Sequence, residues 1–186
     1  MTPAERSARA QQRQQRLEQL PPLPFGSEQE LLTKVLIYLC TAVDDEALTN
    51  SPNEIYQIVK RAPPLNPGEF LVVGGEKNKH RDASRPALRR TDGGWFHFAI
   101  SGRRVNSSTL ELLSYNFEFC FPGKPLQFLR FDLNSPTGIG APNIEKDLRS
   151  HFHPNDERIQ VPAAALTPLE LLDIFVYGLS PRGATS

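Results

Sequence analysis

The 186-residue chain is poor in several features, and each shortage excludes a class of protein. Two cysteines exclude a disulfide-rich scaffold, and both lie in apolar runs (VLIYLC and NFEFCF) that are typical of buried free thiols. Because 21 Lys and Arg balance 21 Asp and Glu, no overall charge attracts the chain to nucleic acid or to a membrane surface. The longest apolar stretch, residues 31–43, contains Lys34 and is shorter than the about 20 residues of a membrane-spanning helix.

The first 24 residues form a polar arm that is rich in Arg and Gln and has no apolar stripe to bury. It also has no apolar segment like that of a secretory signal peptide, so we expect a cytoplasmic protein that makes no membrane contact. We expect the arm to be solvated, the alternative being that its arginines order on a phosphate backbone or a partner. Residues 25–180 are expected to form a single domain, followed by a flexible tail over residues 181–186.

Three helices are predicted from capping boxes, in which a Ser or Thr is followed three residues later by Glu. One box begins at Ser27 and precedes apolar residues at helical spacing up to residue 44. A second begins at Ser51 and predicts a short helix that ends at Arg61, before two prolines. These two helices are expected to form a hairpin. A third box at Thr167 predicts a C-terminal helix that ends near Gly178.

From residue 69 onward the apolar period changes from 3.6 to 2, which indicates strands. Strands are predicted over residues 70–73, 95–100, 110–121, 126–134, 147–153 and 158–161. The sequence therefore predicts an α+β fold, with an N-terminal helical hairpin, an antiparallel sheet of about five strands, and a C-terminal helix packed on the sheet.

The two clearest strands, 110–121 and 126–134, are joined by a Pro-Gly-Lys-Pro link that is typical of a hairpin. Matching their apolar faces fixes the register, because a slip by one residue would turn every side chain to the other face. This register places Glu118 beside Arg130 and Asn116 beside Asp132. The second face of the hairpin is therefore predicted to be polar and charged.

Five residues on or near strands form the candidate catalytic set: Arg130, Asp132, Arg149, His151 and His153. Alternate residues of a strand share a face, so two neighbouring strands would bring these side chains together. Such a set suits acid–base chemistry on a phosphodiester, because one histidine can accept the proton of an attacking hydroxyl while the other protonates the leaving oxygen. The arginines would stabilise charge on the phosphoryl group, and Asp132 would fix a histidine tautomer.

Other uses of these residues remain open. Arg130 and Glu118 could form an ordinary cross-strand ion pair beside surface histidines, or the cluster could bind nucleic acid or protein without catalysis. His151 and His153, two residues apart, could chelate Zn²⁺ with Asp132 or with His97. Because no cysteine pair or HExxH motif accompanies them, the sequence predicts no metal ion and no cofactor.

Basic residues concentrate around the aromatic strand that begins at Trp95. Lysine and arginine can contact phosphates beside aromatic stacking surfaces, an arrangement that suits single-stranded RNA, although a charged run can also be a solvated face. The candidate nucleic-acid-binding residues are Lys77, Lys79, Arg81, Arg85, Arg89, Arg90, Arg103 and Arg104.

Residues 112–178 contain the segments LRFDLN, SHFHP, RIQVP and LTPLELLDIF in that order. This order resembles uncharacterised prokaryotic proteins associated with defence or mobile elements, and TumE-type toxins of toxin–antitoxin pairs. The resemblance implies a small cytosolic prokaryotic protein of the toxin type, with RNA as its target and with an antitoxin or complex subunit as its protein partner.

The sequence thus predicts a cytosolic prokaryotic defence or toxin-type protein that acts on or near RNA, with metal-independent ribonuclease chemistry if it is an enzyme. The alternative is a non-catalytic subunit of a ribonucleoprotein of the CRISPR kind, or of another defence assembly. Such a subunit would dock through the N-terminal arm and through the basic segment, residues 77–90.

Overall fold

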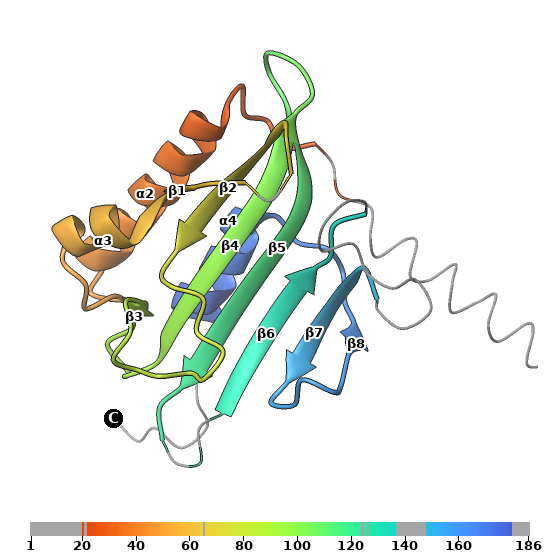
Figure 1. Ribbon diagram of the computed structural model, residues 1–186. Helices are drawn as coiled ribbons and strands as arrows, with labels where there is room; N and C mark the ends of the chain where they lie inside the picture. The colour runs from red at the N-terminus through yellow and green to blue at the C-terminus, as the bar shows by residue number, and fades with distance from the viewer. Residues whose placement is uncertain are drawn as a thin grey trace, which may run out of the picture.

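The computed structural model describes residues 20, 22–64, 66–123, 125, 127–136 and 148–179. Helices and one large antiparallel sheet make up this part of the chain, which confirms the α+β class (Figure 1). The sheet has eight strands, so the prediction of about five strands was too small. Nearly all of the predicted arm and the tail lie outside the described residues. No described helix is both long and apolar enough to cross a bilayer.

Helix α2 (Glu28–Asp44) begins as predicted, with the Ser27 side chain accepting a hydrogen bond from the backbone N–H of Glu30. Helix α3 (Pro52–Ile58) begins with a complete capping box. The prediction that this helix continues to residue 61 was wrong. The chain leaves the helix at Val59, which has φ −94° and ψ 112°, and strand β1 (Val59–Ala62) then pairs with the next strand of the sheet. Backbone pairing at the sheet edge, which no local pattern announces, decides this outcome.

The sheet is antiparallel throughout, in the order β1-β2-β4-β5-β6-β7-β8, with the short β3 paired to β4 beside this path. The remaining strands are β2 (Glu69–Gly74), β3 (Leu88–Arg89), β4 (Trp95–Arg104), β5 (Leu110–Phe121), β6 (Gln127–Leu133), β7 (Ser150–Pro154) and β8 (Val161–Pro162).

The register predicted for the β5–β6 hairpin is confirmed. Glu118 lies opposite Arg130, and Asn116 lies opposite Asp132. Strand β7 then pairs with the other edge of β6, which places His151 opposite Asp132 and His153 opposite Arg130. Three neighbouring strands therefore carry the polar residues that the sequence singled out.

One face of the sheet forms the main core, and the other face is polar at its centre. At one end of this second face Ala87, Trp95, Cys120 and Phe128 form a small apolar cluster. Helix α4 (Pro168–Asp173) and the π-helical turn Ile174–Gly178 follow the predicted Thr167 cap and pack on the core face, behind the sheet in Figure 1. Phe175 is fully buried there, and the centroid of its ring lies 5.7–6.1 Å from the ring centroids of four sheet residues. These are Phe96, Phe117, Phe119 and Phe131. Helix α2 contributes to the same core.

Replacing Phe175 by Ala should lower the free energy of unfolding by about 3–5 kcal/mol, because it leaves a cavity between the C-terminal helix and the sheet. Denaturant unfolding followed by circular dichroism measures this loss. The control is Tyr56→Ala, which removes an aromatic ring that is 60% exposed and should change the stability by no more than about 0.5 kcal/mol. Equal losses in the two variants would contradict the assigned core.

Candidate active site on the polar face

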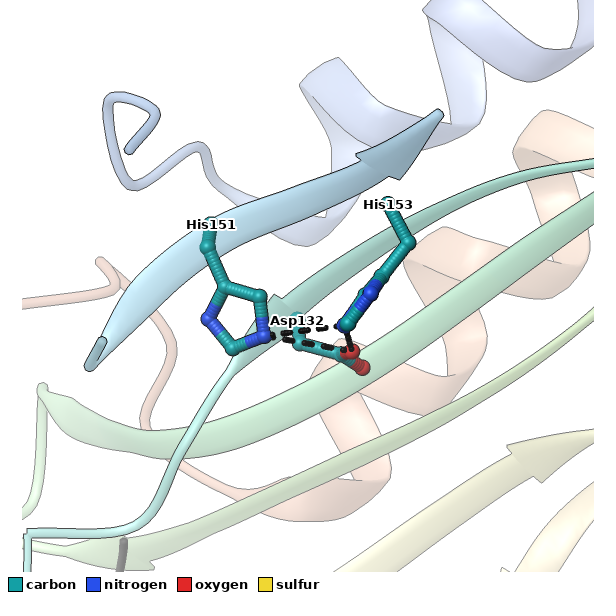
Figure 2. Close-up of side chains that lie close together, drawn as sticks. All are labelled: Asp132, His151 and His153. Atoms are coloured by element: carbon teal, nitrogen blue, oxygen red, sulfur yellow. Dashed lines mark hydrogen bonds and ion pairs between the residues drawn. The ribbon is translucent and has the colours of Figure 1, made fainter. Parts of the chain in front are cut away.

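The centre of the polar face is Asp132, which strand β6 presents between residues of its two neighbours. His151 and His153 lie on the same face of β7, because they are two residues apart. Both imidazoles turn toward the Asp132 carboxylate (Figure 2). Strands β6 and β7 are neighbours, which is the condition under which the sequence pattern brings these three residues together.

The three side chains converge on a small volume. His151 Nε2 lies 3.1 Å from His153 Nε2. Asp132 Oδ2 lies 3.2 Å from His153 Nε2 and 3.6 Å from His151 Nε2. The side chains of the histidines are 3% and 2% exposed, and the 3.1 Å between their Nε2 atoms leaves no room for a water molecule. We refer to Asp132, His151 and His153 as the Asp–His cluster.

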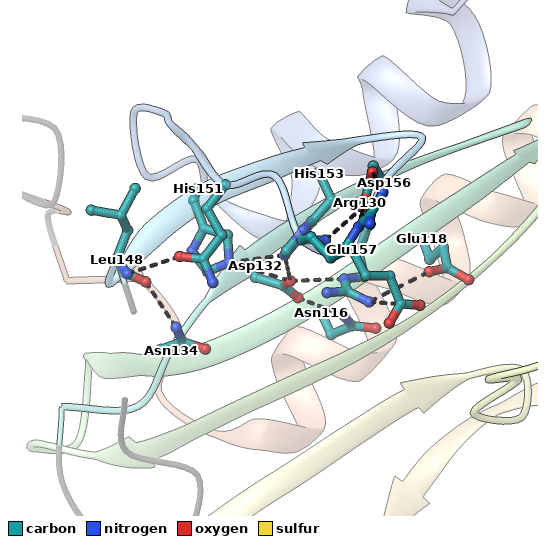
Figure 3. Close-up of polar contacts among 12 residues, drawn as sticks. Asn116, Glu118, Arg130, Asp132, Asn134, Leu148, His151, His153, Asp156 and Glu157 are labelled. Atoms are coloured by element: carbon teal, nitrogen blue, oxygen red, sulfur yellow. Dashed lines mark hydrogen bonds and ion pairs between the residues drawn. The ribbon is translucent and has the colours of Figure 1, made fainter. Parts of the chain in front are cut away.

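Two further residues hold the Asp132 carboxylate in place (Figure 3). Asn116 on β5 donates a hydrogen bond from Nδ2 to Oδ1 at 2.5 Å. Arg130, two residues before Asp132, donates from Nε to Oδ2 at 2.8 Å. Both carboxylate oxygens are therefore engaged, which satisfies a buried anion that would otherwise be costly.

A network of alternating charges continues outward from Arg130. Arg81 contacts Glu118 at 3.0 Å and Glu157 at 2.7 Å. Arg130 reaches the same two carboxylates at 3.9 Å and 3.6 Å. The Arg81 guanidinium also stacks over Phe128, 3.5 Å from the ring centroid. This network joins the loop after β2, two central strands and the turn after β7.

The environment changes the protonation of the Asp–His cluster. Burial by itself would raise the pKa of Asp132, but hydrogen bonding from His153, the charge of Arg130 and the bond from Asn116 together lower it. Burial lowers the pKa of His151, and the charge of Asp132 offsets only part of this effect. The cluster thus favours an ionised carboxylate beside a neutral His151 imidazole.

A pocket of about 480 Å³ opens on the polar face next to the cluster. Asp132 lines it and connects it to the buried histidines. Its other charged and polar side chains come from β4, β5, β6 and the loops after β2, β6 and β7: Lys77, Asn78, Lys79, His97, Asn116, Glu118, Arg130, Asn134 and Glu157. Its size is in the range of small-ligand sites.

The structure separates Arg149 from the other predicted catalytic residues. Its Nη1 donates to the backbone carbonyl oxygen of Asn134 at 2.6 Å, and it does not line the pocket. This contact connects the segment before β7 to the end of β6. The geometry indicates that Arg149 helps to position β7 and does not belong to the pocket.

Most of the predicted nucleic-acid-binding residues have partners within the protein. Arg81 is in the charge network, Arg85 lies 3.7 Å from Glu76, and Arg89 donates to the backbone of its own loop. The remaining arginines also have acidic partners, in the pairs Arg90–Asp92, Arg103–Glu111 and Arg104–Glu28. Within the described part of the chain, Lys77 and Lys79 are the predicted basic residues that line the pocket with no ion pair.

Two site residues were not identified from the sequence, and a third was identified without its contacts. Glu157 lies in the turn after β7, and Asn78 lies in the loop after β2, where it holds the loop by bonds to Asp82. Arg81, in the same loop, was predicted to bind nucleic acid, and the structure shows it bound to Glu118 and Glu157. Residues 81, 118 and 157 meet only in the folded chain, so no local spacing reveals them. The positive φ of Arg81, 51°, is part of the turn that aims this arginine at Glu118.

The Asp–His cluster also has the donor atoms of a metal site. In the part of the chain that the structure describes, it is the group of His, Cys, Asp or Glu side chains that could hold an ion, with its ligand atoms within 4.8 Å of one another. His97 lines the pocket but does not join the cluster, and both cysteines are free thiols.

Comparisons of the chain with protein-family models, with curated proteins and with solved structures found no match. The resemblance of residues 112–178 to TumE-type toxins therefore stays a prediction. We infer the function from the contacts of the Asp–His cluster and of its pocket.

His97 makes stability sensitive to acid. Burial, followed by the positive charges of Arg81, Arg130 and Lys77, lowers the pKa of His97 from 6.5 to about 4. The unfolded chain therefore binds a proton at this residue more readily than the folded chain does. The resulting stability is fully present above pH 6.5 and is lost as the pH falls toward 4.

His97→Gln should remove this sensitivity. Between pH 6.5 and 4, the wild-type protein should lose up to about 3 kcal/mol more folding free energy than the variant. Urea unfolding at several pH values measures the two slopes, and His97→Asn provides a second variant with a different side-chain length. Parallel pH profiles for all three proteins would show that His97 does not resist protonation in the fold.

Proposed function

We propose that the polar face is the active site of a ribonuclease, in which the Asp–His cluster acts on an RNA phosphodiester bound in the adjacent pocket. The observation that carries this proposal is the convergence of Asp132, His151 and His153 at the edge of a pocket that Arg130 and two unpaired lysines also line. Reactive side chains beside cationic phosphate-binding groups are the combination that phosphoryl chemistry needs.

The pocket residues supply contacts for an RNA phosphate. Lys77 and Lys79 are exposed and carry charges that no described acidic residue neutralises. Arg130 is less exposed than these lysines and contacts Asp132, and its planar guanidinium can donate two hydrogen bonds to a phosphate. Asn116 and Asn134 add neutral polar groups to the same wall. These contacts support binding of an anionic, polar substrate.

In the proposed reaction an oxygen nucleophile attacks phosphorus, the bond from phosphorus to the leaving oxygen breaks, and one proton passes from nucleophile to leaving group. The ring nitrogens of the histidines lie only 3.1 Å apart, so a phosphate cannot lie between them. This geometry favours joint action of both histidines on one side of the phosphate over the division into one acid and one base.

The wider role in prokaryotic defence or in a toxin–antitoxin pair belongs to the same proposal and is supported by the resemblance of residues 112–178. The second candidate, a non-catalytic subunit of a ribonucleoprotein, draws its support from the polar pocket and the two unpaired lysines alone, because these could bind RNA without cleaving it. Cleavage of RNA by the purified chain separates the two functions.

The purified full chain should cleave a fluorescent RNA oligonucleotide in at least one of a set of buffers supplied with Zn²⁺, Mn²⁺, Mg²⁺ or EDTA. Asp132→Asn, which keeps the volume of the side chain, should slow cleavage by about 100-fold or more, the usual scale for a group in acid–base or electrostatic catalysis. Arg130→Ala should also slow it, and Arg130→Lys should recover only part of the rate, because lysine lacks the planar fork.

A matched pair of double variants distinguishes the effect of the pocket lysines on RNA binding from the effect of overall positive charge. Replacing Lys77 and Lys79 by Ala should raise the KM for RNA and reduce its dependence on salt. Replacing Arg103 and Arg104 by Ala removes the same charge from strand β4, outside the pocket, and should leave KM near the wild-type value. RNA that is bound and not cut in every buffer would reject the ribonuclease in favour of the assembly subunit.

A further inference from the structure

We propose that Asp132, His151 and His153 bind a divalent transition-metal ion, with Zn²⁺ as the ion that fits best. The sequence predicted no metal, because the chain has no cysteine pair and no HExxH motif. The structure supplies what the motifs do not, since two neighbouring strands bring two imidazole nitrogens and one carboxylate oxygen to a common point (Figure 2).

The spacing of these atoms matches one face of a zinc tetrahedron. Zinc lies about 2.0–2.1 Å from nitrogen ligands and about 2.0–2.2 Å from carboxylate oxygens. In tetrahedral geometry such bonds place neighbouring ligand atoms about 3.3–3.5 Å apart. The three separations in the cluster are 3.1, 3.2 and 3.6 Å. An ion can therefore bind without rearrangement of the strands.

The three potential ligand atoms surround a common point. Asp132 Oδ2 lies 3.2 Å from His153 Nε2 and 3.6 Å from His151 Nε2, and the two Nε2 atoms lie 3.1 Å apart. A cation at the centre attracts all three atoms at once. Neutral imidazole with a free Nε2 lone pair is the form that binds metals.

The neighbours of Asp132 resemble the outer partners of known metal ligands. Asn116 and Arg130 bind the Asp132 carboxylate and fix its orientation, as groups behind metal ligands commonly do. Among the charged residues that line the pocket, Asp132, Glu118 and Glu157 are balanced by Arg130, Lys77 and Lys79. A bound ion would add net positive charge to the site, which attracts phosphate.

Three protein ligands leave a coordination position for water or a substrate oxygen, as in catalytic zinc sites. Asp132 lines the pocket, so the pocket is the route by which that oxygen reaches the ion. The ion would supply Lewis-acid stabilisation of the phosphoryl oxygens. This catalytic use depends on the ribonuclease function proposed above, whereas metal binding does not. Two histidines and one carboxylate also suit Fe²⁺, but phosphodiester cleavage involves no oxidation, which favours Zn²⁺.

Isothermal titration of the tag-free, EDTA-stripped full chain with ZnCl₂ tests the site without RNA. We expect one Zn²⁺ per chain and a rise in Tm, because the ion binds only the folded state. Asp132→Asn, His151→Gln and His153→Gln should each weaken zinc binding about 100-fold or more, since even the outer partners of a metal ligand contribute about 10–100-fold. Asn116→Ala should show that smaller loss.

His80→Gln is the matched control, because it removes an exposed histidine from the loop after β2 and should leave zinc affinity unchanged. Circular dichroism verifies that each variant folds. Equal zinc affinity in wild type, Asp132→Asn and His153→Gln would overturn the metal site. Zinc bound at the cluster with no RNA cut would reject the ribonuclease and leave the metal site standing. If the chain binds no zinc in the titration and cuts RNA at full rate in EDTA, the metal site is rejected and the ribonuclease function stands.

Discussion

The buried carboxylate of Asp132 is the constraint on which the polar face depends. An anion that is only 9% exposed destabilises the fold unless charged or hydrogen-bonding groups surround it. Asn116, Arg130 and His153 meet this requirement from three adjacent strands. Arg130 in turn needs partners of its own for its charge, and Glu118 and Glu157 provide them. The polar face is therefore organised outward from one side chain.

Strand register decides whether this arrangement exists. Asp132 faces Asn116 on one side and His151 on the other, and both pairings depend on the alignment of β6 with its neighbours. A slip by one residue would turn Asp132 into the phenylalanine-rich core and expose Phe131. The aromatic contacts of Phe175 with the core face oppose such a slip. Core packing on one face of the sheet thus fixes the chemistry on the other.

Much of this arrangement could be predicted from the sequence because it depends on alternation. The apolar period of β5 and β6 fixed their register, and the alternate spacing of His151 and His153 placed both on one face. The capping boxes gave the helix starts. Strand β1 was missed because Val59 leaves helix α3 only when a sheet edge offers backbone partners.

The charge network could be predicted only in part. The predicted register gave the pairing of Glu118 with Arg130, but the contacts of Arg81 with Glu118 and Glu157 join residues far apart in the chain, which no local spacing reveals. Most arginines of the basic segment proved to be neutralised by such partners, so a count of charges overstated the free basic surface. The geometry of the metal site could not be predicted from the sequence either. It depends on the distance between the Nε2 atoms of His151 and His153, which residue spacing along a strand does not give.

The most direct test of the central claim is a crystal structure of the zinc-loaded full chain, measured with anomalous scattering at the zinc absorption edge. We expect one anomalous peak about 2.0–2.2 Å from Asp132 Oδ2, His151 Nε2 and His153 Nε2, with a further oxygen ligand on the pocket side. A peak coordinated by other residues, or zinc-treated crystals with an empty Asp–His cluster, would contradict it.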